Sequence, residues 1–391
     1  MDAGAVPISV ISVFTGAMGL DLGFEGEGFD VRVAVDNDPW ARETIKSNRP
    51  GLEAIADDLG AVPTAKLLEK AGLEPGEAAV VLGASPCEPF STAGRRQSMQ
   101  DSRGAAVYDF IKLVKEARPR FFVFEQVPGF LRAAKRHISF YERIAKREED
   151  LDPDERLGSA FDEVMLAFAA TGYALSFDPD RPASSILNAA DFGTPQKRRR
   201  FILVGARDGS AVTLPEPTHG PPDSLEVVAG LREPWVTFRE AVKSLGDEAP
   251  EHLEFPATWG PLLKHVPAGG CWRDLAPELH REALGGAYDE DKTGKKGGRT
   301  GFLRRLAWDR PAPTVVDRPT TRAGCLCHPA ELRPLSVAEY KRLQGFPDAW
   351  AIKGPIGAKY RLVGQATPVP LAGAVARAVL ARVREEASVA V

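Results

Sequence analysis

Short apolar runs rich in β-branched residues alternate with helix-like segments along the first half of the chain. The candidate strands are residues 8–14 (ISVISVF), 31–35 (VRVAV), 78–83 (AAVVLG), 120–125 (RFFVFE) and 200–205 (RFILVG). Such continuous runs are typical of strands that are buried on both faces of a sheet. Helical patterns, such as residues 161–170, fall between them. The alternation predicts an α/β fold with a doubly wound, mainly parallel sheet, whose reactive side chains lie in loops at the carboxyl ends of the strands.

The pattern changes at about residue 207. Residues 207–305 are rich in Pro, Gly and isolated charges, and regular patterns resume near Trp308. We therefore expect a main domain at residues 1–206 and an inserted smaller domain at 207–305. The C-terminal segment, residues 306–391, is expected to return to the main domain.

The composition is that of an ordinary globular protein, with 43% hydrophobic and 27% charged residues among 391. A chain of this length can bury a sizeable core, which excludes disorder as its main state. Lys and Arg together number 50, and Asp and Glu number 54, so the net charge is −4. Any surface that binds nucleic acid must therefore be a local basic patch.

Three features bear on the cellular compartment. The four cysteines are too few for a disulfide scaffold of this length and favour a reducing environment. The N-terminal residues MDAGAVPISV lack a basic region ahead of an apolar stretch, so we expect no signal peptide. No apolar run approaches the roughly 20 residues that cross a bilayer. We expect a cytoplasmic protein with no membrane partner.

A glycine-containing turn follows the first candidate strand. Residues 14–20 read FTGAMGL, and glycines let a backbone turn tightly and approach a ligand closely. Asp36 ends the next strand 20 residues after Gly16, where an acid would hydrogen-bond ribose hydroxyls. The turn lacks the Gly-x-Gly-x-x-Gly spacing, which favours a nucleoside-type cofactor over a dinucleotide. An ordinary strand–turn–helix link with a surface aspartate is the alternative interpretation. A further strand, not among the apolar runs above, could end near Asp58. The Asp58 side chain is either an acceptor for an exocyclic amine or a solvated turn acid.

Three further segments bring reactive side chains next to buried strands. Cys87 lies in the loop SPCEPFS, where it is placed as a nucleophile, although a buried structural cysteine is the alternative. Glu125 ends an apolar strand, and a carboxyl group pressed against apolar surface keeps its proton more easily and can act as an acid. The alternative is that Glu125 simply faces water. The run QKRRR at 196–200 offers forked Arg donors for planar acceptors and phosphates, or forms a solvated basic run.

In this order, these segments resemble the C5-cytosine DNA methyltransferase family over nearly all of residues 8–207 and 306–375. The matching segments are FTGAMGL at 14–20, SPCEPFS at 85–91, DSRG at 101–104, FEQV at 124–127, QKRRR at 196–200, RPLSVAEYKRLQGFP at 333–347 and YRLVGQATP at 360–368. The Pro-Cys loop, the Gln-x-Arg-x-Arg run and Leu-Gln-Gly-Phe-Pro are highly specific in this order. The resemblance implies a Rossmann-like methyltransferase sheet with residues 207–305 as the target-recognition domain.

The same resemblance implies the chemistry of the catalytic residues. The Cys87 thiolate would add to C6 of cytosine and make C5 nucleophilic enough to accept a methyl group from S-adenosylmethionine. Glu125 would contact N3 and the amino group and stabilise the charge as it forms. Arg198 and Arg200 would hold the cytosine site, with Arg200 near the ring O2. Because stacking hides both ring faces, the base must be flipped out of the duplex. The loop at 91–103 resembles the closing loop of the family.

Cofactor and DNA contacts follow from the same resemblance. Phe14 would pack on adenine, Asp36 would hold the ribose hydroxyls and Asp58 the adenine amine. The other implied cofactor-binding residues are Gly16, Ala17, Gly19, Leu20, Asn37, Leu59, Pro86 and Gln365. The expected DNA-binding residues are Ser91, Arg95, Arg96, Arg103, Gln196, Lys295, Lys296 and Arg299, the last three in a Gly-interleaved basic stretch. Cys-x-Cys at 325–327 is a poor zinc spacing, so we expect no metal.

Four positions depart from the family pattern. Ser85 stands where a second Pro is usual and Glu88 where Gln is commonest, whereas Gln126 and Gln365 each stand where Asn is usual. The two glutamines lengthen side chains near the cysteine loop and near the methyl-donor end of the cofactor, and each extra methylene needs room. These changes leave open a variant that uses a modified S-adenosylmethionine-type donor.

The expected substrate is a specific sequence of double-stranded DNA. A cognate restriction endonuclease is an expected partner, a monomer is the expected state, and the bacterial cytosol or nucleoid is the expected location. A tRNA cytosine-5 methyltransferase on the same scaffold and a non-catalytic DNA-binding relic are the alternatives. A recognition region of roughly 100 residues favours duplex DNA over tRNA. The retention of Cys87, Glu125, Arg198 and Arg200 speaks against a relic.

Overall fold

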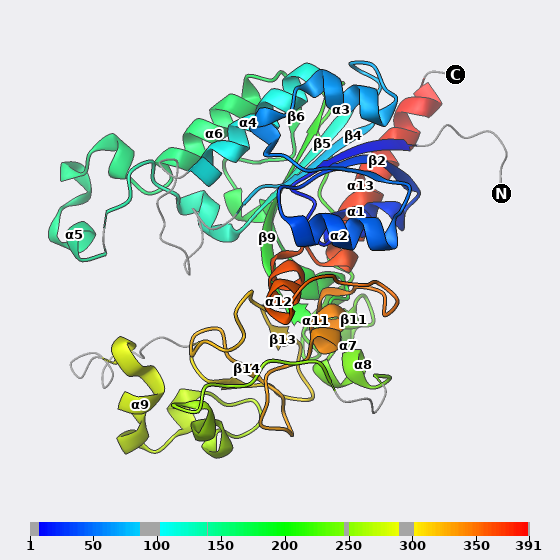
Figure 1. Ribbon diagram of the computed structural model, residues 1–391. Coiled ribbons are helices and arrows are strands. Elements are labelled where there is room, and N and C mark those ends of the chain that lie inside the picture. Colours follow the sequence, from blue (N-terminus) through cyan, green and yellow to red (C-terminus); the bar gives the residue numbers. More distant parts are fainter. Residues whose placement is uncertain (1–7, 87–101, 139, 246–249, 289–300, 390–391) are drawn as a thin grey trace. The chain divides into compact units, whose positions relative to one another are not determined.

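The computed structural model describes residues 8–86, 102–138, 140–245, 250–288 and 301–389 (Figure 1). The chain forms two compact units. The first unit consists of Met1–Asn188, Arg199–Glu216 and Leu371–Val391, and the second of Ala189–Arg198 and Pro217–Pro370. The segment after residue 305 therefore rejoins the first unit only at Leu371. The assignment of residues 207–305 as a target-recognition domain stays a prediction.

An eight-stranded sheet forms the centre of the first unit, in the order β3-β2-β1-β4-β5-β9-β6, with β7 also paired to β9. The strands are β1 (Ile8–Val13), β2 (Phe29–Val35), β3 (Glu53–Ile55), β4 (Val80–Ala84), β5 (Phe121–Gln126), β6 (Ala174–Leu175), β7 (Ile186–Asn188) and β9 (Arg199–Ala206). The first five are mutually parallel, and β9 runs antiparallel to its neighbours. The predicted α/β fold with a mainly parallel sheet is confirmed.

Helices cover both faces of this sheet, α3, α4 and α6 on one and α1, α2 and α13 on the other (Figure 1). The bounds of these helices are α1 (Gly19–Glu25), α2 (Pro39–Asn48), α3 (Thr64–Ala71), α4 (Ser102–Ala117), α6 (Ser159–Ala169) and α13 (Val369–Val389). The unit also contains the short helix α5 (Phe140–Ala145). Apolar strand residues are buried against the covering helices; Phe122 of β5, for example, stacks on Phe168 of α6 with ring centroids 5.3 Å apart. This two-sided burial explains why the strands are continuous apolar runs.

Helix α13 returns the end of the chain to the first unit. A Cβ atom added at Gly23 of α1 would lie 2.4 Å from Cβ of Ala372, so the two helices approach closely only because residue 23 is glycine. Arg377 also donates to Glu27 at 2.5 Å. Among the described residues, one helical stretch, Ile356–Glu386, is long and apolar enough to cross a membrane by length and composition. Over half of its most apolar window is buried, and the core helix of a folded protein passes the same test.

The regular elements of the second unit are short, as the weak periodicity of its sequence indicates. They are β8 (Gln196–Lys197), β10 (His219–Gly220), α7 (Leu225–Val228), β11 (Glu233–Pro234), α8 (Phe238–Val242), α9 (His280–Leu284), β12 (Arg304–Arg305), β13 (Ala312–Pro313), β14 (Leu326–Cys327), α11 (Val337–Gln344) and α12 (Ile356–Gln365). A small core includes Trp259, Trp272 and Cys325. Burial raises the pKa of Cys327 to about 11, which keeps this core thiol protonated.

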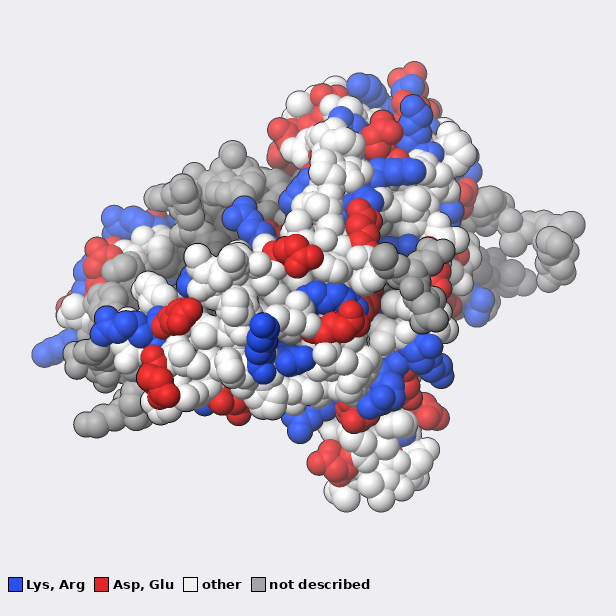
Figure 2. Space-filling model, turned by 60° about the horizontal axis from the view of Figure 1, so that its bottom comes forward, with Lys and Arg blue, Asp and Glu red and all other residues white. Residues whose placement is uncertain are grey.

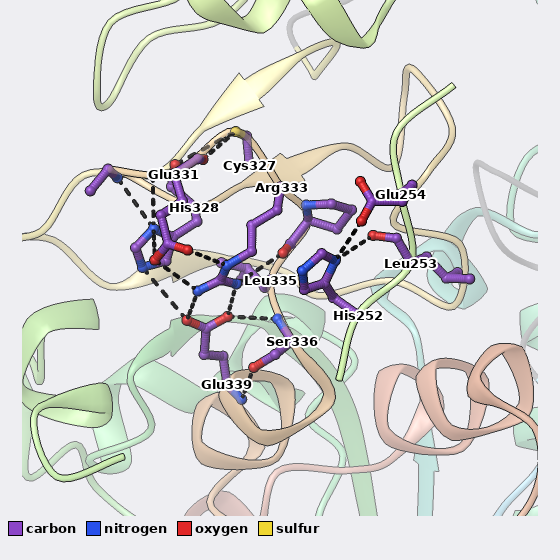
Figure 3. A network of polar contacts seen from close by, with 12 residues as sticks. His252, Leu253, Glu254, Cys327, His328, Glu331, Arg333, Leu335, Ser336 and Glu339 are labelled. Carbon is purple, nitrogen blue, oxygen red and sulfur yellow. Dashed lines mark hydrogen bonds and ion pairs between the residues drawn. The ribbon is translucent and has the colours of Figure 1, made fainter. Parts of the chain in front are cut away.

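An ion network around the buried pair of Arg333 and Glu339 fixes the start of α11 in this unit (Figure 3). The Arg333 guanidinium donates to both carboxylate oxygens of Glu339, at 2.8 and 3.0 Å, and to Glu331 at 2.9 Å. Glu339 also accepts the backbone N–H of Ser336, whose hydroxyl accepts the N–H of Glu339 in return. This capping box ends the extended chain and begins the helix. The RPLSVAEYKRL segment is therefore a structural element of the second unit.

Candidate active site at the carboxyl ends of the strands

The turn after β1 is tied to the end of β2. Phe14 and Gly16 both have left-handed backbone angles, with φ of 56° and 55°. The Gly16 N–H donates to Oδ2 of Asp36 at 2.7 Å, and Oδ1 of Asp36 accepts the N–H of Asp38 at 2.8 Å. Burial raises the pKa of Asp36, and the two N–H donors oppose that shift. The glycine turn and the acid that the sequence predicts as one cofactor site are thus bonded to each other.

This turn leaves room for a ligand. A Cβ atom added at Gly16 would meet nothing within 4 Å, so the backbone there faces open space. Each carboxylate oxygen can accept two hydrogen bonds, so Asp36 keeps the capacity to accept ribose hydroxyls. Beside it, Asn37 donates to Oδ1 of Asp58 at 2.5 Å, which joins the ends of β2 and β3. These features fit a nucleoside-type cofactor.

The remaining cofactor candidates divide into three groups. Ala17 just before α1, Leu20 in its first turn and Leu59 after Asp58 are buried, and their contact with a cofactor stays a prediction. Gly19 begins α1, and Pro86 immediately precedes Cys87. Gln365 belongs to the second unit, and its contact with a cofactor stays a prediction.

Glu125 and Arg200 form a nearly buried ion pair. Nε of Arg200 lies 2.6 Å from Oε1 of Glu125, and the two side chains are 9% and 8% exposed. In the antiparallel β5–β9 ladder Glu125 lies opposite Ile202, so Arg200, two residues away, shares its face. Glu125 therefore faces a guanidinium and not apolar surface alone. The structure brings together two of the residues that the sequence predicts as catalytic.

Arg198 and Gln196 lie in the second unit, where they hold the backbone. The Arg198 guanidinium is 1% exposed and donates to the carbonyls of Val315, Gly364 and Gln365 at 2.8 to 3.2 Å. Its contact with cytosine stays a prediction. Gln196 is fully buried, donates to the Leu343 carbonyl at 3.0 Å and accepts the Val315 N–H at 2.8 Å. Its side chain thus holds the backbone, and a contact of Gln196 with DNA stays a prediction.

Several predicted site residues fall outside the described part of the chain. They are Cys87, Ser91, Arg95, Arg96, Lys295, Lys296 and Arg299, and the side chain of Arg103 in α4 is likewise not described. Figure 2 shows Lys and Arg interspersed with Asp and Glu on one face, without a continuous basic surface among the described residues drawn there. Within the described ranges, no group of three or more His, Cys, Asp or Glu side chains could hold a metal ion.

Sequence reasoning missed a buried carboxyl group behind the glycine turn. Asp21 of α1 is 1% exposed, and its carboxylate oxygens make no well-aligned hydrogen bond among the described residues. Burial raises its pKa to about 7, and a weak interaction with the Ser12 hydroxyl offsets part of that effect. The only signal in the sequence is an acid at the start of an apolar helix, in GLDLGF.

A glycine turn bonded to an acid at the carboxyl edge of a mainly parallel sheet is typical of α/β enzymes that bind nucleoside-type cofactors. A model of the C-5 cytosine-specific DNA methylase family matches residues 8–381 of this chain. The chain belongs to that family and is a DNA cytosine-5 methyltransferase. The predicted family and enzyme class are confirmed.

Named relatives agree with this assignment. The type II methyltransferase M.PspPI of Psychrobacter sp. (strain TA137) is 32% identical over 376 residues, which cover 95% of this chain and 79% of the relative. M.SacI of Streptomyces achromogenes is 30% identical, covering 95% and 93%. Among solved structures, a protein described as a DNA modification methyltransferase of an Escherichia coli prophage has a TM-score of 0.61 at 20% identity, covering 96% and 99%. Entamoeba histolytica methyltransferase EhMeth has 0.59 at 13%, covering 97% and 99%. These two structures bear on the fold alone.

Proposed function

We propose that this chain methylates C5 of a cytosine flipped out of a specific duplex DNA sequence, with S-adenosylmethionine as donor and Cys87 as covalent nucleophile. One observation carries the proposal. The pair of Glu125 and Arg200 lies at the carboxyl end of β5, and Glu125 lies opposite Ala84, the last residue of β4. Cys87 follows Ala84 by three residues, within about 11 Å of extended chain. A nucleophile and a paired carboxylate therefore come from neighbouring strand ends.

S-adenosylmethionine fits the residues at the adjacent strand ends. Asp36 would hold the ribose hydroxyls, Asp58 the adenine amine, and the half-buried ring of Phe14 would pack on the adenine. The open face of Gly16 would let the methionine part approach the backbone. When bound, the cofactor supplies an electrophilic methyl group on a sulfonium sulfur.

The chain's own residues account for the activation of cytosine. The Cys87 thiolate adds to C6, the electron pair of the C5–C6 double bond forms a C4–C5 double bond, and the pair of the C4–N3 double bond moves to N3. Glu125, protonated in the reacting complex, donates its proton to N3 and accepts a hydrogen bond from the amino group, and Arg200 stabilises the developing charge near O2. After methylation a base removes the C5 proton. The electron pair of that C–H bond re-forms the double bond and expels Cys87 as thiolate.

The biological setting that we propose is a restriction–modification system. Relatives that this chain resembles over 95% of its length are named type II methyltransferases. A cognate endonuclease that cuts the same unmethylated sequence is the expected partner, and the enzyme is expected to act as a monomer in the bacterial cytosol or nucleoid.

The test offers labelled S-adenosylmethionine with duplex DNA or with tRNA. We expect label in DNA alone, and bisulfite sequencing of DNA from expressing cells should then show one methylated sequence. Label in tRNA alone would instead support the tRNA enzyme. No transfer to either acceptor would contradict the proposed donor, and transfer from a modified S-adenosylmethionine-type donor would support the donor variant.

A further inference from the structure

Two of the residues that depart from the family pattern, Ser85 and Gln126, are in contact. β4 and β5 are parallel neighbours whose last paired residues are Ala84 and Glu125. Ser85 and Gln126 each follow one of these, so both lie at the same edge of the sheet, where Gln126 is still paired with Phe201 of β9. Ser85 is 3% exposed and Gln126 is fully buried.

The carboxamide of Gln126 binds the turn that leaves β4. Its Nε2 donates to the Ser85 hydroxyl at 3.0 Å and to the Ser85 carbonyl at 3.2 Å, and it lies 3.5 Å from the Pro86 carbonyl. Its Oε1 accepts the N–H of Val127 at 2.8 Å. That last bond fixes which end of the carboxamide carries the hydrogens, because an exchanged group would set two donors against each other.

These contacts link the two strand ends that carry the proposed chemistry. Gln126 is covalently attached to Glu125, and Ser85 and Pro86 lead directly into Cys87. The side chain of Gln126 is fully buried, and both Nε2 and Oε1 of its carboxamide are hydrogen-bonded. A displacement of Ser85 relative to Gln126 would therefore displace the start of the cysteine loop relative to the carboxylate.

We propose that Ser85 and Gln126 form a positioning pair that sets the distance between the Cys87 loop and Glu125. The proposal rests on the proposed function of Cys87. The hydroxyl of Ser85 and the length of the Gln126 side chain act together. Without the hydroxyl, the buried Gln126 carboxamide loses one of its hydrogen bonds, and with a carboxamide one methylene shorter the buried Ser85 hydroxyl loses its donor.

The test is a double-mutant cycle in the full-length enzyme with duplex DNA. Ser85→Ala should lower kcat by about tenfold while KM for DNA and donor changes by less than about threefold, because misplacement affects the reacting geometry and not binding. Ser85→Thr, which keeps a hydroxyl, should retain kcat to within about threefold. In a Gln126→Ala background, Ser85→Ala should have no further effect, because the partner is already gone. Equal effects in both backgrounds, or unchanged kcat in Ser85→Ala, would overturn the pair.

Ser9→Ala is the matched control. Ser9 is also a buried serine that joins strand ends, since its hydroxyl donates to the Glu77 carbonyl and accepts the Ala79 N–H, but it lies at the amino edge of the same sheet. It should lose thermal stability and keep kcat. If Ser85→Ala does not fold, Gln126→Asn replaces it, and a normal kcat there would overturn the pair.

A Cys87→Ser arm separates this proposal from the proposed function. Full methylation by Cys87→Ser would refute the nucleophile itself. Loss of methylation in Cys87→Ser together with an additive cycle would refute the positioning pair alone.

Discussion

The buried carboxyl of Asp21 makes the stability of the first unit depend on pH. Burial raises its pKa from 3.8 to about 7. Between these values the folded chain keeps a proton that the unfolded chain has lost, so the free energy of unfolding falls as pH rises and the loss is complete above pH 7. This rise of the Asp21 pKa corresponds to a loss of at most about 4 kcal/mol in the free energy of unfolding. Asp21→Asn, which resembles the protonated form, should remove this loss.

The assay uses urea unfolding at pH 5 and pH 8.5. Trp40 is the only tryptophan within the first unit, so its resonance in chains labelled with 5-fluorotryptophan reports that unit. Asp21→Asn should be more stable than wild type by about 2 to 4 kcal/mol at pH 8.5, with most of that difference gone at pH 5. Asp180→Asn, which changes an exposed carboxyl, should follow the wild type at both values. A difference between Asp21→Asn and wild type that is the same at both pH values would refute the reasoning.

Three further outcomes are expected. Glu125→Gln removes the charge that faces Arg200 and should lower kcat at least about 100-fold with DNA binding retained in a gel-shift assay; wild-type kcat would exclude Glu125 from catalysis. Asp36→Ala loses charged hydrogen bonds worth about 1.5 to 3 kcal/mol and should weaken S-adenosylmethionine binding by about 10- to 100-fold in calorimetry, whereas unchanged affinity would place the ribose elsewhere. Gly23→Ala places a methyl group against Ala372 and should lower the free energy of unfolding by about 1 to 3 kcal/mol. The control Gly51→Ala has open space around its methyl group and should not lower it. Equal effects of the two substitutions would contradict the close helix contact.

The sequence predicts the parallel half of the sheet well, because those strands are buried on both faces and their apolar runs are unmistakable. The run that ends at Val35 places Asp36 where the structure has it, bonded to Gly16. The two-residue strand β6 is too short to produce a pattern of its own. The return of the chain at Leu371 is also hidden, because α13 continues one helical pattern across the boundary between the units.

The candidate site is predicted in its residue types and only partly in its contacts. Arg198 and Arg200 are two residues apart and would share a face in a continuous strand. The strand is interrupted at Arg198, between β8 and β9, so Arg198 binds carbonyls of the second unit while Arg200 pairs with Glu125. The pairing of Glu125 with Arg200 depends on the antiparallel insertion of β9 beside β5, which local pattern does not encode. Burial of Asp21 and Gln196 likewise follows from tertiary packing.

The most direct test of the central claim is trapping on duplex DNA that carries 5-fluorocytosine in the methylated sequence. Fluorine at C5 cannot leave as a proton does, so the enzyme should remain bound to C6, and mass spectrometry of the digested complex should locate the nucleotide on Cys87. A missing adduct, or an adduct on Cys271, Cys325 or Cys327, would contradict the account.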